Sequence, residues 1–312
     1  MTKSLRWMIA ACSVGLLAAC DSGSGSDPAA QGQAGGQQPQ PAVATGGAPA
    51  GKSTLQAAKE SGRVRIGYAN EAPFAYMDPA TGQLTGESVE IARTVLGKLG
   101  VGEVEGVLTE FGSLIPGLQA GRFDVIAAGM YVTPERCKQV TFSNPTYGVG
   151  QAFIVPTGNP KDLHGYEDVA KGDTRLGVVV GAIEASYAEQ TGIPSERVVV
   201  FPDAASALAG VQGGRADAYA ATALTVNDLL AKAGEGKLER AQPFTDPNVD
   251  GQSVRGYGAF AFRASDQDFA DAFNGELATF LGSDAHRQLV EPFGFTEAEL
   301  PGDVTAAQLC GQ

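Results

Sequence analysis

Arg136 ends a short stretch, YVTPER, whose residue types suit an anion. Thr133 is a favourable helix N-cap residue, and Pro134 fits the first turn of a helix. A helix that begins here leaves backbone N–H groups free, and the guanidinium of Arg136 adds a planar pair of donors that matches a carboxylate. The sequence therefore predicts a carboxylate site at this turn. The alternative is a surface capping motif with a solvated arginine.

Three aromatic residues follow strand-like segments: Phe74 in ANEAPF, Phe111 in EFGS and Tyr131 in AGMYVTPER. Each of them could pack in a core instead. Their polar or glycine neighbours favour an exposed cluster, and such a cluster indicates a ligand-binding surface. Aromatic faces attract cations, and Glu71 can accept hydrogen bonds from N–H groups of a ligand. Together with Arg136, these residues predict a site for a zwitterion.

Residues 46–54, GGAPAGKST, match the phosphate-loop pattern, with Gly46, Gly51, Lys52 and Ser53 at its fixed positions. A working phosphate loop follows a buried strand, which aims the loop at the start of a helix. The segment before Gly46 is rich in Gly, Ser, Gln, Pro and Ala and cannot form a core strand. We therefore interpret the match as part of a flexible linker, and we do not expect this chain to hydrolyse ATP.

The first residues have the pattern of an export signal. Two basic residues precede an apolar run that is too short to span a bilayer as a mature helix. The run ends in LAAC, which resembles a bacterial lipoprotein signal. We expect removal of residues 1–19, lipidation of Cys20, which would anchor the chain to the outer face of a membrane, and a flexible linker over residues 20–52. An ordinary signal peptide with an unrelated cysteine is the alternative.

The composition is acidic, with a formal net charge of −13; loss of the signal removes Lys3 and Arg6 and brings it to −15. An acidic surface argues against a nucleic-acid partner. Two cysteines follow the lipidation site, and we expect Cys137 and Cys310 to pair in an oxidising compartment, with two free thiols as the alternative. We expect no cofactor and no metal site.

β-Branched strand segments alternate with amphipathic helices along most of the chain, an order typical of a parallel sheet with crossover helices. The series runs twice, since LIPGLQAGRFDVIAAG corresponds to ALAGVQGGRADAYAAT. We expect two α/β lobes, the first formed by residues 53–153 and 256–312 and the second by residues 154–255. Two apolar segments, GQAFIVP and GYGAFAF, are expected to be paired hinge strands between the lobes, at Ala152–Val155 and Gly258–Phe262.

Local signals place several helices. SVEIARTVLGKLG puts four apolar residues on one helical face and ends in a glycine. Ser113 and Asp203 are the expected N-cap residues of two further helices. Because open α/β sheets bind ligands beyond the carboxyl ends of their strands, the loops that carry the aromatic residues are expected to face a cleft between the lobes.

The chain resembles the polar-amino-acid (family 3) solute-binding proteins of ABC importers over residues 53–312. Within them, GYANEAPFAY and GRFDVIAAGMYVTPERCKQVTFSNPTYG are similar to the ectoine- and hydroxyectoine-binding proteins. The resemblance implies an α/β, two-lobed periplasmic-binding-protein fold that is type II-like. It also implies that the three aromatic residues surround the cationic ring of the ligand, that Arg136 binds the carboxylate and that Glu71 accepts from the ring nitrogens.

The second lobe departs from the amino-acid binders of this family. They usually carry an aspartate that binds the α-ammonium group, whereas DAYAAT has Thr222 at that position. A hydroxyl does not neutralise an ammonium group, so Thr222 favours a delocalised ring cation over an α-amino acid. Gly181 and Ala182, in VGAIEAS, are expected to offer backbone donors, and Thr133 joins the ligand-binding set from the first lobe.

These features predict a monomeric, extracytoplasmic solute-binding lipoprotein that captures ectoine or hydroxyectoine and delivers it to an ABC permease, with ATP hydrolysed by a separate subunit. A polar α-amino acid is the first alternative ligand. An enzyme on the same fold, such as a prephenate or arogenate dehydratase, is the second alternative. His164 and His286 lie in a polar loop and in a helix, so they are not expected to form an acid–base pair.

Overall fold

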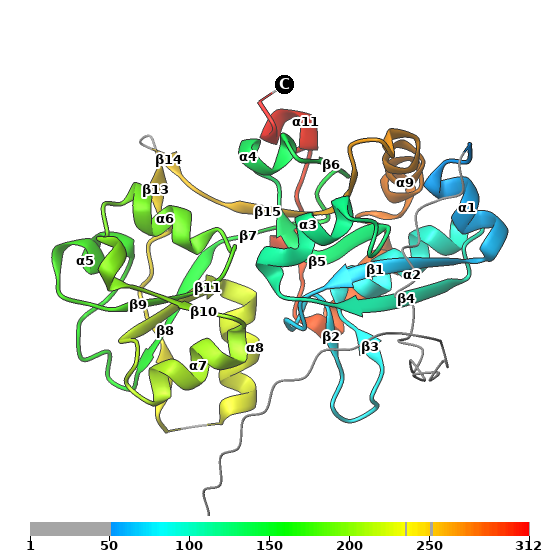
Figure 1. The fold of residues 1–312 in the computed structure, drawn as a ribbon. Coiled ribbons are helices and arrows are strands. Elements are labelled where there is room, and N and C mark those ends of the chain that lie inside the picture. Colours follow the sequence, from blue (N-terminus) through cyan, green and yellow to red (C-terminus); the bar gives the residue numbers. More distant parts are fainter. Residues whose placement is uncertain (1–50, 235, 250–251, 312) are drawn as a thin grey trace, which may run out of the picture. The chain divides into compact units, whose positions relative to one another are not determined.

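The computed structural model describes residues 51–234, 236–249 and 252–311. Two main β-sheets organise this part of the chain (Figure 1). The first sheet has the strand order β4-β1-β5-β15-β6, and β7 also pairs with β15. Its strands are β1 (Arg63–Tyr68), β4 (Glu103–Leu108), β5 (Val125–Tyr131), β6 (Val140–Phe142), β7 (Tyr147–Val149) and β15 (Gly256–Arg263).

The second sheet has the strand order β10-β9-β11-β8-β12. Its strands are β8 (Gln151–Pro156), β9 (Leu176–Val179), β10 (Val198–Phe201), β11 (Ala218–Thr222) and β12 (Leu238–Arg240). Both sheets follow one plan, in which three parallel strands are flanked by an antiparallel strand, β15 in the first sheet and β8 in the second. The predicted two-lobed α/β fold is therefore confirmed.

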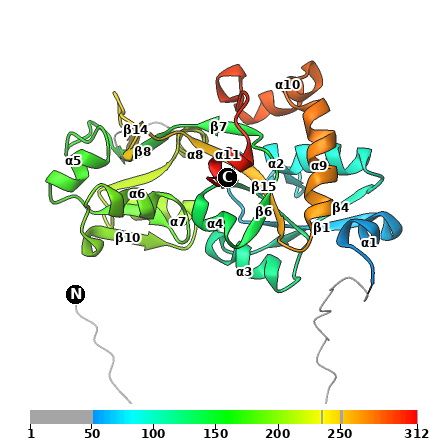
Figure 2. The same ribbon diagram turned by 90° about the horizontal axis from the view of Figure 1, so that it is seen from above.

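Helices cover both sheets. The first lobe holds α1 (Thr54–Ser61), α2 (Glu87–Lys98), the 3-10 helix η1 (Phe111–Ser113), α3 (Leu114–Gln119), α4 (Pro134–Cys137), α9 (Gln267–Phe280), α10 (Asp284–Val290), two further 3-10 turns, η3 (Glu291–Phe293) and η4 (Glu297–Glu299), and α11 (Ala306–Leu309). The second lobe holds α5 (Tyr166–Lys171), α6 (Glu184–Gln190), η2 (Ser195–Arg197), α7 (Ala204–Gln212) and α8 (Ala223–Ala233). Helix α2 packs against α9 and α10 (Figure 2). Two short hairpins complete the fold, β2 (Tyr76–Met77) with β3 (Leu84–Thr85), and β13 (Asn248–Val249) with β14 (Gln252–Ser253).

Most of the predicted helix caps and buried helix faces are present in the structure. The Thr133 side chain caps α4, with Pro134 in its first turn, and the Asp203 side chain accepts from the Ser206 N–H group at the start of α7. The apolar face of α2 is buried as expected. Ser113 stands at the N-cap position of α3 but makes no side-chain cap bond. The preceding 3-10 turn, η1, runs directly into α3. The predicted N-cap position is therefore correct, but the predicted side-chain hydrogen bond is not formed.

The repeat seen in the sequence recurs as a repeated ion pair. In the first lobe, the Arg65 guanidinium donates to both carboxylate oxygens of Asp124 and its backbone N–H donates to Oδ2. In the second lobe, Arg175 makes the same three bonds to Asp217. Burial alone would raise the pKa of Asp217, but the hydrogen bonds from Arg175 outweigh it and lower that pKa to about 2. Each pair ties the first parallel strand of its lobe to the turn before the third.

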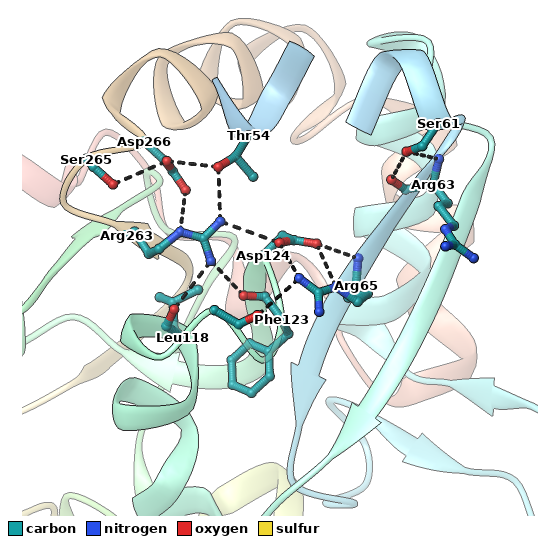
Figure 3. A network of polar contacts seen from close by, with 11 residues as sticks. Thr54, Ser61, Arg63, Arg65, Leu118, Phe123, Asp124, Arg263, Ser265 and Asp266 are labelled. Atoms are coloured by element: carbon teal, nitrogen blue, oxygen red, sulfur yellow. Dashed lines mark hydrogen bonds and ion pairs between the residues drawn. The ribbon is translucent and has the colours of Figure 1, made fainter. Parts of the chain in front are cut away.

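A larger polar network surrounds the first of these pairs (Figure 3). Arg263, at the end of β15, forms ion pairs with Asp124 and Asp266, at 3.4 and 2.9 Å, and donates to the Thr54 hydroxyl. The Thr54 hydroxyl in turn donates to Asp266. The network therefore joins the start of the described chain to the segment that returns after the second lobe, and it fixes the first lobe as one unit built from two chain segments.

The predicted hinge needs a correction. The segments Ala152–Val155 and Gly258–Phe262 are strands, but they do not pair with each other. The first lies in β8, which pairs with β11 and β12, whereas the second lies in β15, which pairs with β5, β6 and β7. Hydrophobic runs of this kind suit a buried central strand as well as a hinge. Since β8 begins at Gln151, the predicted lobe boundary after residue 153 falls inside the second sheet, and we propose that the chain crosses at Gly150 and again just before Gly256.

Cys137 and Cys310 form a disulfide bond in the structure, which links α4 to the last described turn of the chain. The predicted signal, the lipidation site Cys20 and Gly46 of the phosphate-loop match lie outside the described residues. Within them, Ser53 caps α1 and Lys52 pairs with Glu60 of the same helix. Among the residues that the structure describes, no helix is long and apolar enough to cross a membrane.

Candidate functional site

A cavity opens where the carboxyl ends of the parallel strands of both lobes meet. The space outside the protein atoms in this region is about 420 Å³, part of it open solvent. The lining residues come from the loops and strand ends after β1, β4, β5, β9 and β11. They are Glu71, Phe74, Phe111, Gly129, Tyr131, Arg136, Val179, Ala182, Ile183, Glu184, Tyr219, Ala221 and Thr222.

The three predicted aromatic residues all line this cavity. The rings of two of them pack directly against glycines of the first sheet. A Cβ atom added to Gly129 would lie 2.6 Å from the Phe74 ring, and one added to Gly256 would lie 1.8 Å from the Tyr131 ring. These distances are far below van der Waals contact, so only glycine lets the rings lie against β5 and β15. We call the lining rings of Phe74, Phe111 and Tyr131 the aromatic wall. The lack of side chains at Gly129 and Gly256 therefore sets the position of two of its rings.

A fourth aromatic residue, Tyr147, supports the wall from behind. Its ring stacks on Phe74 with 5.1 Å between centroids, and its hydroxyl donates to the Gly129 carbonyl at 2.8 Å. Gly258 gives it room in the same way, because a Cβ atom there would lie 2.1 Å from the Tyr147 ring. Tyr147 is not a lining residue, and its part in the site was not predicted from the sequence.

Phe111 belongs to the 3-10 turn before α3 and is only partly buried. The Arg136 guanidinium lies 5.6 Å from the centre of its ring, within cation–π distance. Phe111 therefore lines the cavity next to Arg136.

Arg136 is oriented by two backbone carbonyls, since its guanidinium donates to Tyr131 O at 2.8 Å and to Gly181 O at 3.0 Å. Among the described residues, no carboxylate lies within ion-pair distance of it. Burial lowers the pKa of Arg136, and the charge of Glu184 acts in the opposite direction. A guanidinium fixed in this way, without an acidic partner in the described part of the chain, is suited to bind the carboxylate of a ligand.

Glu71 lies in a tight turn after β1, where it forms an isolated antiparallel bridge with Ala75. Its side chain accepts a 2.8 Å hydrogen bond from the Thr225 hydroxyl of the second lobe. Burial raises the pKa of Glu71, and the Thr225 bond opposes that shift. Glu71 therefore serves both as a lining acid and as a contact between the lobes.

The predicted second-lobe residues and Thr133 do not all line the cavity. Ala182 and Thr222 line the cavity, whereas Gly181 and Thr133 are not lining residues. The Gly181 carbonyl accepts a hydrogen bond from Arg136, and the donor role expected of the Gly181 backbone N–H stays a prediction. Thr133 uses its hydroxyl to cap α4.

Glu184 is the lining residue that matters most among those missed by sequence reasoning. It is 4% exposed, and burial raises the pKa of its carboxyl to about 7. In the loop VGAIEAS only backbone groups were predicted to contact the ligand, although its glutamate follows a strand end just as Glu71 does. Glu184 supplies an acid from the second lobe, so Thr222 in place of the usual aspartate does not leave the cavity side of this lobe without a carboxylate.

The two lobes touch beside the cavity. Gly181, with φ of 74°, lies so near η1 that an added Cβ atom would be 2.5 Å from Gly112 Cα. With the Arg136–Gly181 and Thr225–Glu71 bonds, this contact joins the two lobes beside the cavity.

Neither of the two histidines, His164 and His286, is a lining residue of the cavity. His164 binds the Asp162 carboxylate and the Pro243 carbonyl, and His286 is buried in the first lobe. Within the described part of the chain, no group of three potential ligands could hold a metal ion.

Comparisons with known proteins agree with this architecture. Residues 64–296 match the family of bacterial extracellular solute-binding proteins, family 3. A probable amino-acid ABC transporter periplasmic-binding protein, y4tE, of Sinorhizobium fredii (strain NBRC 101917 / NGR234) is 41% identical over 265 residues, which cover 84% of this chain and 87% of that protein.

Two solved structures are similar as well. The crystal structure of EhuB in complex with hydroxyectoine has a TM-score of 0.75 and 37% identity, and the match covers 82% of this chain and 97% of EhuB. The ancestral amino acid-binding protein AncCDT-1, a precursor of cyclohexadienyl dehydratase, has a TM-score of 0.66 and 29% identity, over 77% of this chain and 99% of that one. From its sequence, fold and cavity, the chain belongs to the bacterial extracellular solute-binding proteins of family 3, the amino-acid type that serves ABC transporters.

Proposed function

We propose that this protein captures the zwitterionic compatible solute ectoine or hydroxyectoine and delivers it to an ABC permease whose ATPase is a separate subunit. The observation that carries the proposal is the convergence of three aromatic residues, one arginine and one glutamate, all predicted from the sequence, on a single cavity. The similarity to EhuB, which was solved with hydroxyectoine, supports the same ligand class.

The proposed binding mode follows from the partners of each side chain. The ligand carboxylate pairs with Arg136, whose guanidinium is already oriented by Tyr131 O and Gly181 O. The ring cation lies against the aromatic faces, each desolvated contact contributing about 2 kcal/mol. Glu71 accepts a hydrogen bond from a ring N–H group. The Tyr131 and Gly181 carbonyls orient Arg136, and the Thr225 hydroxyl binds Glu71. Groups oriented by the protein itself lower the ordering cost of binding.

A polar α-amino acid is the second candidate, and Glu184 is the observation that favours it. Its carboxylate lines the cavity from the second lobe and could bind an α-ammonium group in place of the aspartate that is common in the family. The aromatic wall contributes more to a delocalised ring cation than to a compact, strongly hydrated ammonium group, and for this reason we place ectoine first.

Calorimetric titration tests the choice between ectoine and a polar α-amino acid as the ligand. Ectoine and hydroxyectoine are expected to bind at least about 100-fold more tightly than glutamine or arginine, a difference of roughly 2.7 kcal/mol. Tighter binding of either amino acid would overturn the ectoine assignment in favour of the second candidate. Incubation with prephenate and arogenate, followed by product analysis, checks the dehydratase alternative, and turnover of either acid would contradict a binding role.

We also propose that residues 1–19 are removed, that Cys20 carries the lipid anchor and that the protein acts as a monomer outside the cytoplasm. The LAAC sequence supports the anchor. Labelling of cells with a radioactive fatty acid should mark the wild-type protein but not a Cys20→Ala variant. Light scattering of the delipidated protein should give the mass of one chain, and a dimer mass would contradict the monomer.

A further inference from the structure

Glu87, the first residue of α2, is a buried acid outside the ligand cavity. It is 1% exposed and is not a lining residue of that cavity. Its carboxylate accepts from the Ser88 hydroxyl at 2.7 Å and from the Thr146 hydroxyl at 2.8 Å, with one donor on each oxygen. Both donors are neutral, and burial of a carboxylate with neutral partners costs stability. Stability alone therefore does not account for an acid at this position.

The backbone at Glu87 is bonded to the turn that carries Phe74. The Glu87 N–H donates to the Pro73 carbonyl at 3.0 Å, and the Ser88 N–H donates to the Phe74 carbonyl at 2.9 Å. Gly86 precedes the helix with a φ of 121°, and an added Cβ atom there would lie 2.4 Å from the Phe74 carbonyl oxygen. The start of α2 and this turn are packed backbone against backbone, so a shift of Glu87 also moves the backbone of Phe74.

The side chain of Glu87 is connected to the second ring of the stack through Thr146. Thr146 donates to Glu87 Oε1 and is followed directly by Tyr147. Tyr147 stacks on Phe74 with 5.1 Å between the ring centroids. Glu87 is thus bonded to the chain neighbour of each ring, to Pro73 through its N–H and to Thr146 through its carboxylate.

We propose that Glu87 is a positioning residue for ligand binding, which holds the stack of Phe74 and Tyr147 in place through the Pro73 carbonyl and the Thr146 hydroxyl. The inference rests on the proposed function, in which the Phe74 ring contacts the ligand. Two hydroxyl donors that lie on different oxygens need a carboxylate. A glutamine has a single acceptor oxygen, so one of the two hydroxyls would lose the acceptor that it has here. This requirement accounts for an acid with neutral partners.

The test is calorimetric titration of wild type, Glu87→Gln, Thr146→Val and Thr146→Ser with ectoine. Burial raises the pKa of Glu87 to about 7, so titration at pH 8 keeps its carboxylate ionised. Valine has nearly the shape of threonine but cannot donate, whereas serine keeps the hydroxyl. Glu87→Gln and Thr146→Val are each expected to bind ectoine about 5- to 20-fold more weakly, because a displaced ring loses contact with the ligand. Thr146→Ser is expected to stay within about twofold of wild type.

The double variant Glu87→Gln/Thr146→Val distinguishes one shared contact from two separate effects. Because both substitutions break the same bond, the double variant should bind at most about twofold more weakly than the weaker of the two single variants. Fully additive losses would overturn the assigned contact. Thr94→Val is the matched control, since Thr94 lies on the same helix and its hydroxyl donates to the Glu90 carbonyl. It should bind ectoine as wild type does.

A measurement without ligand reports on the ring itself. NMR spectra of protein with isotope-labelled phenylalanine rings contain the signals of Phe74, which Phe74→Leu identifies. These signals should be displaced in Glu87→Gln and in Thr146→Val and unchanged in Thr94→Val. Melting curves of the unliganded proteins define the temperatures at which every variant is folded, and all measurements are made below them.

The outcomes separate the positioning role from the proposed function. If wild type binds ectoine and both Glu87→Gln and Thr146→Val bind it equally well, the positioning role is overturned and the proposed function stands. Weaker binding with Phe74 signals at their wild-type positions would overturn the positioning role as well. If wild type does not bind ectoine, the proposed function is overturned, and the Phe74 signals still decide whether Glu87 positions the ring.

Discussion

The Thr225 hydroxyl donates a 2.8 Å hydrogen bond to the Glu71 carboxylate, and this bond joins the two lobes at the ligand cavity. The Thr222 hydroxyl donates to Thr225 Oγ1 at 3.0 Å and accepts from the Thr225 backbone N–H. Thr222, singled out in the sequence for the aspartate it replaces, therefore also orients the residue that holds Glu71. An acid that lines the cavity from one lobe is thus positioned by the first turn of a helix of the other lobe.

Thr225→Val should weaken ligand binding. Valine has nearly the same shape as threonine but cannot donate, so the closed state loses one hydrogen bond and leaves Glu71 without that partner. The expected cost is about 1–2 kcal/mol, a 5- to 30-fold higher dissociation constant by calorimetry. Thr279→Val, on α9 and remote from the cavity, is the control. Equal affinities of both variants and wild type would show that the bond forms without contributing to closure.

Arg136→Ala should weaken ectoine binding more than loss of any single aromatic residue. The alanine variant leaves a buried ligand carboxylate without its partner, at a cost of about 3–5 kcal/mol. Tyr131→Leu keeps apolar area and loses only the aromatic face, so we expect a cost of about 2 kcal/mol. Calorimetric titration of both variants with ectoine shows which substitution weakens binding more. Binding of ectoine by Tyr131→Leu at wild-type affinity would mean that the wall acts only as a hydrophobic surface.

Gly256→Ala should impair binding although residue 256 is not a lining residue. The new Cβ atom would lie 1.8 Å from the Tyr131 ring, so the ring has to move out of its place in the wall. We expect at least a tenfold loss of affinity, measured by titration. Gly275→Ala is the control, because Gly275 lies within α9 with nothing near its Cβ position, and alanine there should stabilise the protein by roughly 0.5–1 kcal/mol. Unchanged affinity in Gly256→Ala would contradict a positioning role.

Glu87→Gln should flatten the pH dependence of stability. Glu87 is 1% exposed, accepts from Ser88 and Thr146, and has a pKa raised by burial to about 7 from an ordinary value of 4.5. Between these values the native state holds more protons than the unfolded state, so this group lowers stability as pH rises, by at most about 1.4 kcal/mol per unit. Urea unfolding at pH 5 and pH 8 should show a smaller decline in the variant. An equal decline in the free energy of unfolding from pH 5 to pH 8 in the variant and in the wild type would contradict the raised pKa of Glu87.

Cys310→Ser should destabilise the protein without changing ligand affinity at low temperature. The bond to Cys137 closes a loop across 173 residues of sequence, and loss of such a link costs about 2–5 kcal/mol. Thermal melting measures the effect, and the double variant with Cys137→Ser should melt at the same temperature as the single one. Two free thiols in the denatured, unreduced wild-type protein would show that the bond does not form in solution.

The sequence allowed the fold to be predicted well because each lobe repeats one local pattern. Strand runs, capped helices and the Gly-Arg-x-Asp turn are short-range signals, and Asp124 and Asp217 make equivalent bonds in the two lobes. The pairing of the two apolar segments was predicted wrongly. Hydrophobicity shows that β8 and β15 are buried but not which neighbours they bind, since strand pairing is a property of the whole sheet.

The first-lobe residues of the site were predictable because their motifs are contiguous: Arg136 with its cap, and aromatic residues after strand ends. Glu184 and Tyr147 were missed for different reasons. Glu184 looks like an ordinary acidic residue in the first turn of a helix, and only its burial distinguishes it. Tyr147 acts through Phe74 and Gly129, contacts that depend on three separate chain segments.

Gly112 and Gly181 bring the backbones of the two lobes together beside the cavity. An added Cβ atom at Gly181 would lie only 2.5 Å from Gly112 Cα, so a side chain there would hold the lobes farther apart. The distance between the two sides of the cavity thus depends in part on a glycine that is not among the lining residues.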